Sequence, residues 1–254
     1  EITLPEGLGQ LGYSHRGIFG KWHLGHNHPK WHPNNQGFTH FHGHYNGAID
    51  YFTLSREGER DWHLNEKSNP ETGYSTDLIA SAASEFILNC AKEEAPFLCY
   101  VPFNAPHSPF QAPEKYMKKF QHLAGQNVKG KNKSRRQVVA AMVSCMDDGI
   151  GKILNAIDSS GEADNTIVWF FSDNGGIKEL PENNLPLRGN KLDVWEGGVR
   201  VAAAMRWPNG GVQDGLKISV PLSCVDVMPT LVNIAGGSGV ILGKKKFDGF
   251  DVLQ

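Results

Sequence analysis

The 254-residue sequence has little that points to a nucleic acid or a membrane. Its formal net charge is only −2, so no global field favours binding to an anionic polymer or an anionic bilayer. No apolar run approaches the roughly 20 residues that a membrane-spanning helix needs. The first residues have neither the basic n-region nor the apolar h-region of a secretion signal. We therefore expect the chain to begin inside a folded region or after a processed segment.

Cysteine is scarce and widely scattered. The four cysteines stand at positions 90, 99, 145 and 224, and no two of them form a CxxC pair. Each lies in an apolar stretch, which favours buried free thiols. The cysteines therefore leave the redox compartment of the protein open.

Apolar segments of strand length alternate with amphipathic helical patterns along the chain. The predicted strands are residues 16–19, 97–101, 166–171 and 199–205. The predicted helices are a short one before residue 16, one from residue 76 to about 92, one over about 137–159 and one over 224–235. Strand, helix and strand at this spacing predict an α/β domain with a largely parallel central sheet.

Two regions carry more specific expectations. Residues 166–171 (TIVWFF) are β-branched and aromatic throughout, which favours a strand covered on both faces. We expect this strand to lie parallel to residues 97–101 in one sheet, directly beside it or one strand apart. Residues 21–74 are rich in His, Asn and Gly and show little periodicity, so we expect a long functional loop there.

Three predicted strands end in polar, glycine-rich segments. They run into residues 20–25 (GKWHLG), 102–109 (PFNAPHSP) and 172–176 (SDNGG). Ligands of α/β sheets bind beyond the carboxyl ends of the strands. If the three strands are parallel neighbours, one crevice receives five polar side chains: Lys21, His23, His107, Asp173 and Asn174. Cations, imidazoles and hard oxygen atoms together suit an anionic tetrahedral ester beside a divalent metal.

Each of these residues also has a plainer interpretation. Asp173 and Asn174 suit Ca²⁺ or Mg²⁺ better than zinc, but on local sequence alone a simple Asx turn with glycines after it is the favoured explanation. Two oxygens also leave most of a shell of six to eight ligands unfilled. His107, between prolines, could be a loop imidazole tied to the backbone. Lys191 precedes a Gly-Gly segment that is either a ligand-approaching backbone or a turn before a strand.

The histidines are crowded into one part of the chain. Eight of the eleven fall between His15 and His44, and His40, His42 and His44 alternate. Alternation places side chains on one face of an extended segment, where they could bind zinc or copper. No paired acidic or thiolate spacing accompanies them, so we favour a polar loop that faces substrate.

Four motifs in order resemble the sulfatase family of the alkaline-phosphatase-like superfamily, in particular arylsulfatase-B-like enzymes. Residues 20–25 (GKWHLG) match the family's second signature letter for letter. The others are residues 105–109 (APHSP), 172–176 (SDNGG) and 186–191 (PLRGNK) continuing through 196–200 (EGGVR). The resemblance extends over nearly the whole chain, to residue 251. It implies a three-layer α/β/α fold and a metal-dependent sulfuric ester hydrolase acting on aryl or sugar sulfates.

The resemblance also implies a role for each matching residue. Lys21 and Lys191 match the lysines that hold the sulfate oxygens. His107 matches the histidine over the sulfate and the leaving group, and His23 matches the one beside the nucleophile. In the family, a formylglycine made from Cys or Ser is hydrated, and one of its hydroxyls attacks sulfur. The implied partner is a sulfated small molecule or glycan, and the implied location is extracytoplasmic.

Asp173 and Asn174 match two ligands of the family's metal, usually calcium. The formylglycine motif Cys/Ser-x-Pro-x-Arg is absent from the chain, as are the paired N-terminal aspartates and the smaller C-terminal subdomain of the family. We expect residues 1–254 to be a partial catalytic domain, incomplete at both ends, that binds metal weakly and is inactive alone. Two alternatives remain: a phosphodiesterase or phosphonate hydrolase of the same superfamily, and a non-catalytic relic that binds anions or sulfated glycans.

Overall fold

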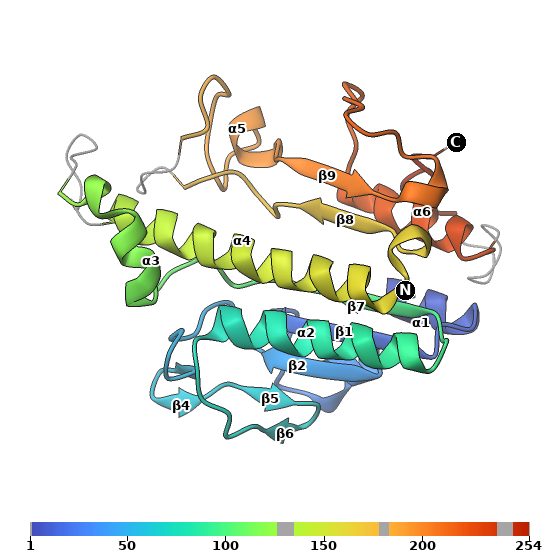
Figure 1. The fold of residues 1–254 in the computed structure, drawn as a ribbon, viewed down its shortest axis with the longest axis horizontal. Helices are drawn as coiled ribbons and strands as arrows, with labels where there is room; N and C mark the ends of the chain where they lie inside the picture. Colours follow the sequence, from blue (N-terminus) through green and yellow to red (C-terminus); the bar gives the residue numbers. More distant parts are fainter. Residues whose placement is uncertain (1, 126–134, 178–182, 238–245, 254) are drawn as a thin grey trace.

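A five-stranded sheet forms the base of the fold, which is taken from a computed structural model that describes residues 2–125, 135–177, 183–237 and 246–253 (Figure 1). Its strand order is β6 (Lys67–Ser68), β5 (His63–Leu64), β2 (His40–His44), β1 (His15–Lys21) and β7 (Phe97–Tyr100). β1 runs parallel to both β2 and β7, whereas β5 and β6 add antiparallel strands at one edge. The centre of this sheet is therefore parallel, as predicted.

β1 is the most buried strand, and its side chains alternate between two apolar clusters. Phe19 packs on one face with Ile79 and Trp62. Ile18 packs on the other face with Phe41, in a cluster built from the segment that follows β1. Both β1 side chains are fully buried, and each such burial is worth about 1.5–3 kcal/mol. These two clusters fix where the carboxyl end of β1 emerges.

Two long helices pack side by side over one face of the sheet (Figure 1). α2 (Ser75–Lys92) lies on β1 and β7, and α4 (Arg135–Ser160) lies along α2. Gly149 of α4 allows close approach, because an added Cβ would lie 3.1 Å from the Cβ of Ala80. Both helices were predicted to within two residues at each end. The shorter α3 (Glu114–Lys119) packs against α4.

The strand predicted over residues 166–171 exists, but its expected partner is wrong. β8 (Val168–Phe171) pairs antiparallel with β9 (Ala203–Arg206) in a separate two-stranded sheet, not with β7. It is also not covered on both faces, since Phe170 and Phe171 remain 42% and 40% exposed. β7, expected to be buried, is the edge strand of its sheet and is half-buried among the described residues. Residues 199–205 begin as the helix α5 (Glu196–Val199) rather than as a strand.

Residues 21–74 are more regular than the sequence suggested. Besides β2, β5 and β6 they contain the hairpin of β3 (Ser55–Arg56) and β4 (Glu59–Arg60) and two 3₁₀ turns, Pro29–Trp31 and Pro33–Gln36. The alternating histidines belong to β2 and do share one face, where they contact aromatic rings. One ring nitrogen of His42 bonds Glu71 and one of His44 bonds the carbonyl of Asn46, whereas Nε2 of His44 is buried without a hydrogen-bond partner. Among the described residues no three His, Cys, Asp or Glu side chains are grouped to hold a metal, so the zinc or copper interpretation is not supported.

The N-terminal helix packs against the last helix of the described chain. α1 (Leu4–Gln10), which begins with a capping box between Thr3 and Glu6, contacts α6 (Val227–Ile234). Short 3₁₀ turns complete the fold: Gln121–Leu123, Ala163–Asn165, Pro208–Gly210 and Cys224–Asp226.

All four cysteines are free, as expected, but only Cys90 and Cys145 are buried; Cys99 is half-buried and Cys224 is exposed. No helix in the described ranges is long and apolar enough to cross a membrane.

Candidate functional site

The carboxyl end of β1 carries the first pair of candidate residues. The backbone N–H of Lys21 donates to the carbonyl of Pro102, which draws the segment after β7 to this strand end, at an N···O distance of 2.9 Å. Gly20, at φ +126°, makes this approach possible, because a Cβ there would lie 2.3 Å from that carbonyl oxygen. Beyond the sheet, the N–H of His23 donates to the carbonyl of Tyr45 at 2.9 Å. His23 itself has a left-handed φ of +53°.

His107 lies in the segment that follows β7 and is fixed by its own backbone. Its N–H donates to the carbonyl of Asn104, and its carbonyl accepts from the hydroxyl of buried Tyr51 at 2.8 Å. Its ring Nδ1 lies 2.9 Å from the carbonyl of Ser108, which can only accept, so Nδ1 carries a proton. The other ring nitrogen, Nε2, is thereby left to exchange a proton with a ligand.

Lys191 is joined to the loop after β8 by backbone bonds. Its N–H donates to the carbonyl of Gly176 at 2.9 Å, and the N–H of Gly175 donates to the carbonyl of Gly198 at 3.0 Å. A Cβ on Gly175 would lie 1.9 Å from the carbonyl oxygen of Gly197, so only glycine fits this crossing. The glycines of the two motifs thus bring Lys191 beside residues 172–176.

Charges from these segments act on one another. Burial lowers the pKa of Lys21, and the nearby charge of Lys191 adds to this while Asp173 opposes it. Burial also lowers the pKa of His23, and the charges of Lys21, His107, Arg56 and Lys191 lower it further. The end of β1, the segment after β7 and the loops after β8 therefore lie within electrostatic range of one another. The premise of the predicted crevice, three parallel neighbouring strands, is nevertheless wrong, because β8 lies in a different sheet from β1 and β7.

Asp173 and Asn174 offer hard oxygen atoms at the end of β8. Asp173 is exposed, and Asn174 uses its amide nitrogen to bond the carbonyl of Gly175 at 3.0 Å, which leaves the amide oxygen to bind a cation. Within the described ranges, no three His, Cys, Asp or Glu side chains are arranged to hold a metal ion. The pair therefore fits a hard divalent cation in kind, but supplies only two of the six to eight oxygens such an ion takes.

Two further polar residues near His23 were missed by sequence reasoning. Arg56, in the β3–β4 hairpin, acts on the pKa of His23. Asp61 is a buried carboxylate, 5% exposed, that bonds the turn after β2. Neither stands in a recognisable motif. For Asp61, the one signal in the sequence was its place directly before Trp62 in an otherwise polar stretch.

Comparisons with known proteins agree with the motifs. The family model described as Sulfatase matches residues 1–237. Arylsulfatase J of Mus musculus is 33% identical over 263 residues, which cover 99% of this chain and 41% of that protein. N-acetylgalactosamine-6-sulfatase of Mus musculus is 31% identical over 270 residues, covering 100% of this chain and 48% of that protein. The chain thus spans less than half the length of these two relatives.

Solved structures share the fold. The crystal structure of Ps i-CgsB superposes with a TM-score of 0.84 at 31% identity, over 98% of this chain and 56% of that one. The same protein in complex with k-i-k-neocarrahexaose gives 0.83 at 32% identity, over 92% and 53% of the two chains. PsFucS1 sulfatase from Pseudoalteromonas sp., at 21% identity, shares the fold with a TM-score of 0.79 over 100% of this chain and 54% of that one. These similarities confirm the α/β fold class.

Proposed function

The chain belongs to the sulfatase family, and we propose that it forms part of the catalytic domain of a sulfuric ester hydrolase acting on aryl or sugar sulfates. Sulfatases are generally dependent on a metal and on formylglycine. The feature that carries the proposal is that three separate segments lie close enough for the charges of His107, Asp173 and Lys191 to act on the pKa values of Lys21 and His23. Such a group of cations beside a carboxylate suits a sulfate ester next to a metal.

The two lysines would bind the oxygens of the sulfate group. Hydrogen bonds of about 3 Å from Lys21 and Lys191 would neutralise charge that grows on these oxygens in the transition state. Lys21 is half-buried, where such an interaction is stronger than in bulk water. These lysines therefore stabilise the transferring group without taking part in proton transfer.

The two histidines would handle protons. In His107, Nδ1–H is committed to the carbonyl of Ser108, so the doubly protonated ring would give its Nε2 proton to the leaving alcohol and return to the neutral form. Because burial and the surrounding cations lower the pKa of His23, its ring is mostly neutral at pH 7 and can take up a proton. The pair thus offers a donor and an acceptor on one site.

Asp173 and Asn174 would hold the metal, which we propose to be Ca²⁺, with Mg²⁺ as the second choice. When bound, the ion would neutralise charge on the sulfate group. Since two residues supply only part of its shell, the remaining ligands and the formylglycine would come from other segments of a longer protein. We accordingly propose that residues 1–254 are an incomplete sulfatase catalytic domain and are inactive alone.

A sulfated glycan is the proposed substrate class. It is supported by the similarity to Ps i-CgsB, whose structure contains k-i-k-neocarrahexaose, and to N-acetylgalactosamine-6-sulfatase. The polar and aromatic region between Trp31 and Trp62 would face the sugar. We also propose an extracytoplasmic location, as the family resemblance implies.

Activity of the full-length protein tests this proposal. The full-length protein, coexpressed with a formylglycine-generating enzyme, should hydrolyse an aryl sulfate or a sulfated oligosaccharide, whereas residues 1–254 alone should not. Changing Lys191 to alanine should lower kcat/KM by about 10²–10³-fold, the usual cost of losing a charge-stabilising donor. The matched change Lys92→Ala, at an exposed lysine that ends α2, should leave kcat/KM unchanged.

Other outcomes would change the assignment. Turnover of sulfate esters by residues 1–254 alone would mean that this segment contains its own nucleophile. Turnover of phosphonates or phosphodiesters by the full-length protein, without sulfatase activity, would favour the related hydrolases. No turnover of any ester, with retained sulfate binding, would make the protein a non-catalytic relic.

A further inference from the structure

The turn that follows β2 lies directly against His23. The N–H of His23 donates to the carbonyl of Tyr45, and the N–H of Trp22 donates to the carbonyl of His44, both at 2.9 Å. The ring of His23 lies on Gly47, because a Cβ there would be 2.6 Å from Cε1 and 2.7 Å from Nε2. The position of residues 44–47 therefore decides where the imidazole of His23 is placed.

Asp61 holds this turn with both carboxylate oxygens. Oδ1 accepts from the N–H of Tyr45 at 2.9 Å, and Oδ2 accepts from the N–H and the side-chain amide of Asn46 at 2.9 and 2.8 Å. His63 Nε2 lies 3.2 Å from Oδ1. A buried carboxylate is stable only when its lone pairs are filled in this way. Although burial alone would raise the pKa of Asp61, these hydrogen bonds hold it well below its usual range.

His44 supports the same turn from the strand. Its Nδ1 donates to the carbonyl of Asn46 at 2.8 Å, and its ring lies nearly parallel to that of Trp62, with an interplanar angle of 18°. The residue is completely buried. The turn is thus fixed on one side by a carboxylate and on the other by an imidazole, and it has little freedom to shift under His23.

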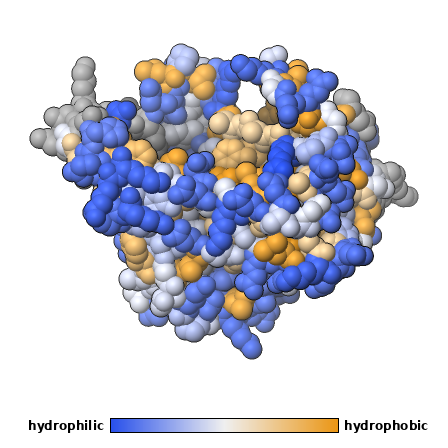
Figure 2. Space-filling view, viewed as in Figure 1, coloured by the Kyte–Doolittle hydropathy of each residue, from blue (hydrophilic) through white to orange (hydrophobic). Residues whose placement is uncertain are grey.

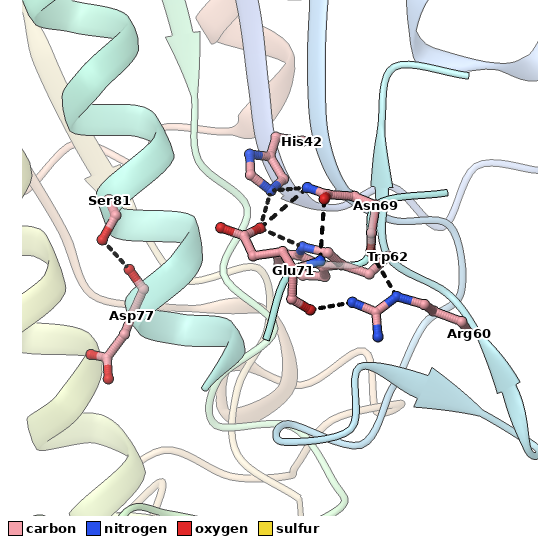
Figure 3. Close-up of polar contacts among 7 residues, drawn as sticks. All are labelled: His42, Arg60, Trp62, Asn69, Glu71, Asp77 and Ser81. Carbon is pink, nitrogen blue, oxygen red and sulfur yellow. Dashed lines mark hydrogen bonds and ion pairs between the residues drawn. The ribbon is translucent and has the colours of Figure 1, made fainter. Parts of the chain in front are cut away.

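A polar network joins Trp62, the residue that follows Asp61, to β2 (Figure 3). Trp62, the next residue, donates from Nε1 to Glu71 Oε2 at 2.9 Å, and His42 of β2 contacts the same oxygen at 2.7 Å. The N–H of Asn69 donates to the carbonyl of Trp62 at 2.8 Å. Figure 3 shows the side chains of His42, Trp62 and Asn69 gathered around the Glu71 carboxylate. The segment that carries Asp61 is thereby anchored to the strand whose end it holds.

From these contacts we propose that Asp61 is a positioning residue for His23, acting through the turn formed by residues 45–47. Asp61 does not reach the reacting atoms, and its carboxylate works by fixing the backbone on which the imidazole rests. The expected effect on turnover rests on the proposed sulfatase function. The effect on the placement and titration of His23 does not.

The decisive comparison is between Asp61→Asn and Glu71→Gln in the full-length protein. Each change replaces a carboxylate by an amide of equal size, but Glu71 bonds the network of His42 and Trp62 and does not touch the turn. In Asp61→Asn, one oxygen becomes an NH₂ group that faces backbone N–H donors, so the turn must move. Histidine-selective ¹⁵N NMR should then show a changed ring shift and pKa for His23. Glu71→Gln keeps every bond between Asp61 and the turn and loosens only the anchor of the Asp61 segment, so it should change both by much less.

Kinetics give a second readout that a merely stabilising residue would not alter. Because a misplacement of about 1 Å can cost 10²-fold in rate, Asp61→Asn should lower kcat by about 10–100-fold with a small change in KM. The limb of the pH–rate profile that reports His23 should move with the pKa seen by NMR. If the wild-type protein has no sulfatase activity, the proposed function fails, and the NMR comparison still decides the positioning role.

Two further variants keep the test decisive if Asp61→Asn does not fold. Asn46→Ala removes one of the donors to Asp61 and should change the His23 signals in the same direction, by less. Gly47→Ala inserts a Cβ under the ring and should displace His23 while Asp61 keeps its bonds. Unchanged His23 signals in a folded Asp61 or Asn46 variant, with only a lower stability, would overturn the proposal.

Discussion

The described residues before position 168, the first part of the chain, and those from position 168 onward, the second part, differ sharply in how much apolar surface they bury. Among the described residues, every fully buried apolar core side chain except Val232 lies before residue 168. After it, Leu192 and Val194 are 92% and 89% exposed. Figure 2 shows apolar surface gathered in the upper middle of the molecule, around the place where Figure 1 draws β8 and β9. The first part of the chain forms a packed apolar core, whereas the second part is held mainly by backbone hydrogen bonds and close glycine contacts.

This difference also divides the candidate site. Lys21, His23 and His107 stand at the ends of segments that a hydrophobic core fixes. Asp173 and Lys191 stand on loops that are joined through the crossings of Gly175 with Gly197 and Gly198. The free energy of unfolding should therefore depend mainly on the first part of the chain, whereas ligand binding should depend on both parts.

Replacing a phenylalanine by alanine should show the difference between the two parts most strongly. Phe19 is fully buried between β1 and α2, so Phe19→Ala should reduce the free energy of unfolding by about 3–5 kcal/mol. Phe171 lies on β8 and is 40% exposed. Phe171→Ala should therefore reduce the free energy of unfolding by less than about 1 kcal/mol, as substitutions of exposed residues usually do. Urea denaturation followed by circular dichroism measures both. Equal losses of unfolding free energy in the two variants would mean that the second part of the chain is also tightly packed in solution.

Acidification should lower the free energy of unfolding through His44, which lies in the first part of the chain. Burial lowers the pKa of His44 from 6.5 to about 4. Between these values the unfolded chain binds a proton that the folded chain does not, so stability falls as the pH drops from 6.5 towards 4. At about 1.4 kcal/mol for each pKa unit, the loss should approach about 3 kcal/mol.

The matched variant for this prediction is His44→Gln, whose amide can still donate to the carbonyl of Asn46. The slope of stability against pH in this window should be shallower in the variant than in the wild-type protein. Because His23, His32 and His40 also have lowered pKa values, the difference between the two proteins is the quantity to compare. Identical slopes would contradict the assignment to His44.

Calcium should have the smallest effect on the free energy of unfolding, and it should act through Asp173 and Asn174 in the second part of the chain. With two oxygen-bearing residues available, residues 1–254 should bind Ca²⁺ with a Kd no tighter than about 10⁻³ M. At about 10 mM Ca²⁺ the gain in unfolding free energy would then be at most about 1.4 kcal/mol. Calorimetry on the wild-type chain and on Asp173→Asn measures this. Tight stoichiometric binding would show that other residues complete the shell.

Much of the fold was accessible from local patterns. α2 and α4 follow from the spacing of residues such as Ile79, Ala83 and Ile87, because a helix buries one face at every third or fourth residue. The glycine-rich motifs after β1, β7 and β8 were located correctly as strand ends. β2 was missed since histidine and glycine are weak strand formers, although the alternation of His40, His42 and His44 was the strand signal.

The sequence by itself therefore determined the two long helices, the strand ends, the family and the candidate polar residues, because each depends on neighbours in the chain. Tertiary structure decided which strands pair, that β8 takes β9 as its partner, and that Asp61 bonds a turn fifteen or sixteen residues away. Such pairings depend on long-range packing and on the satisfaction of buried polar groups. A buried carboxylate looks like any surface aspartate until the backbone amides that fill its lone pairs are placed around it.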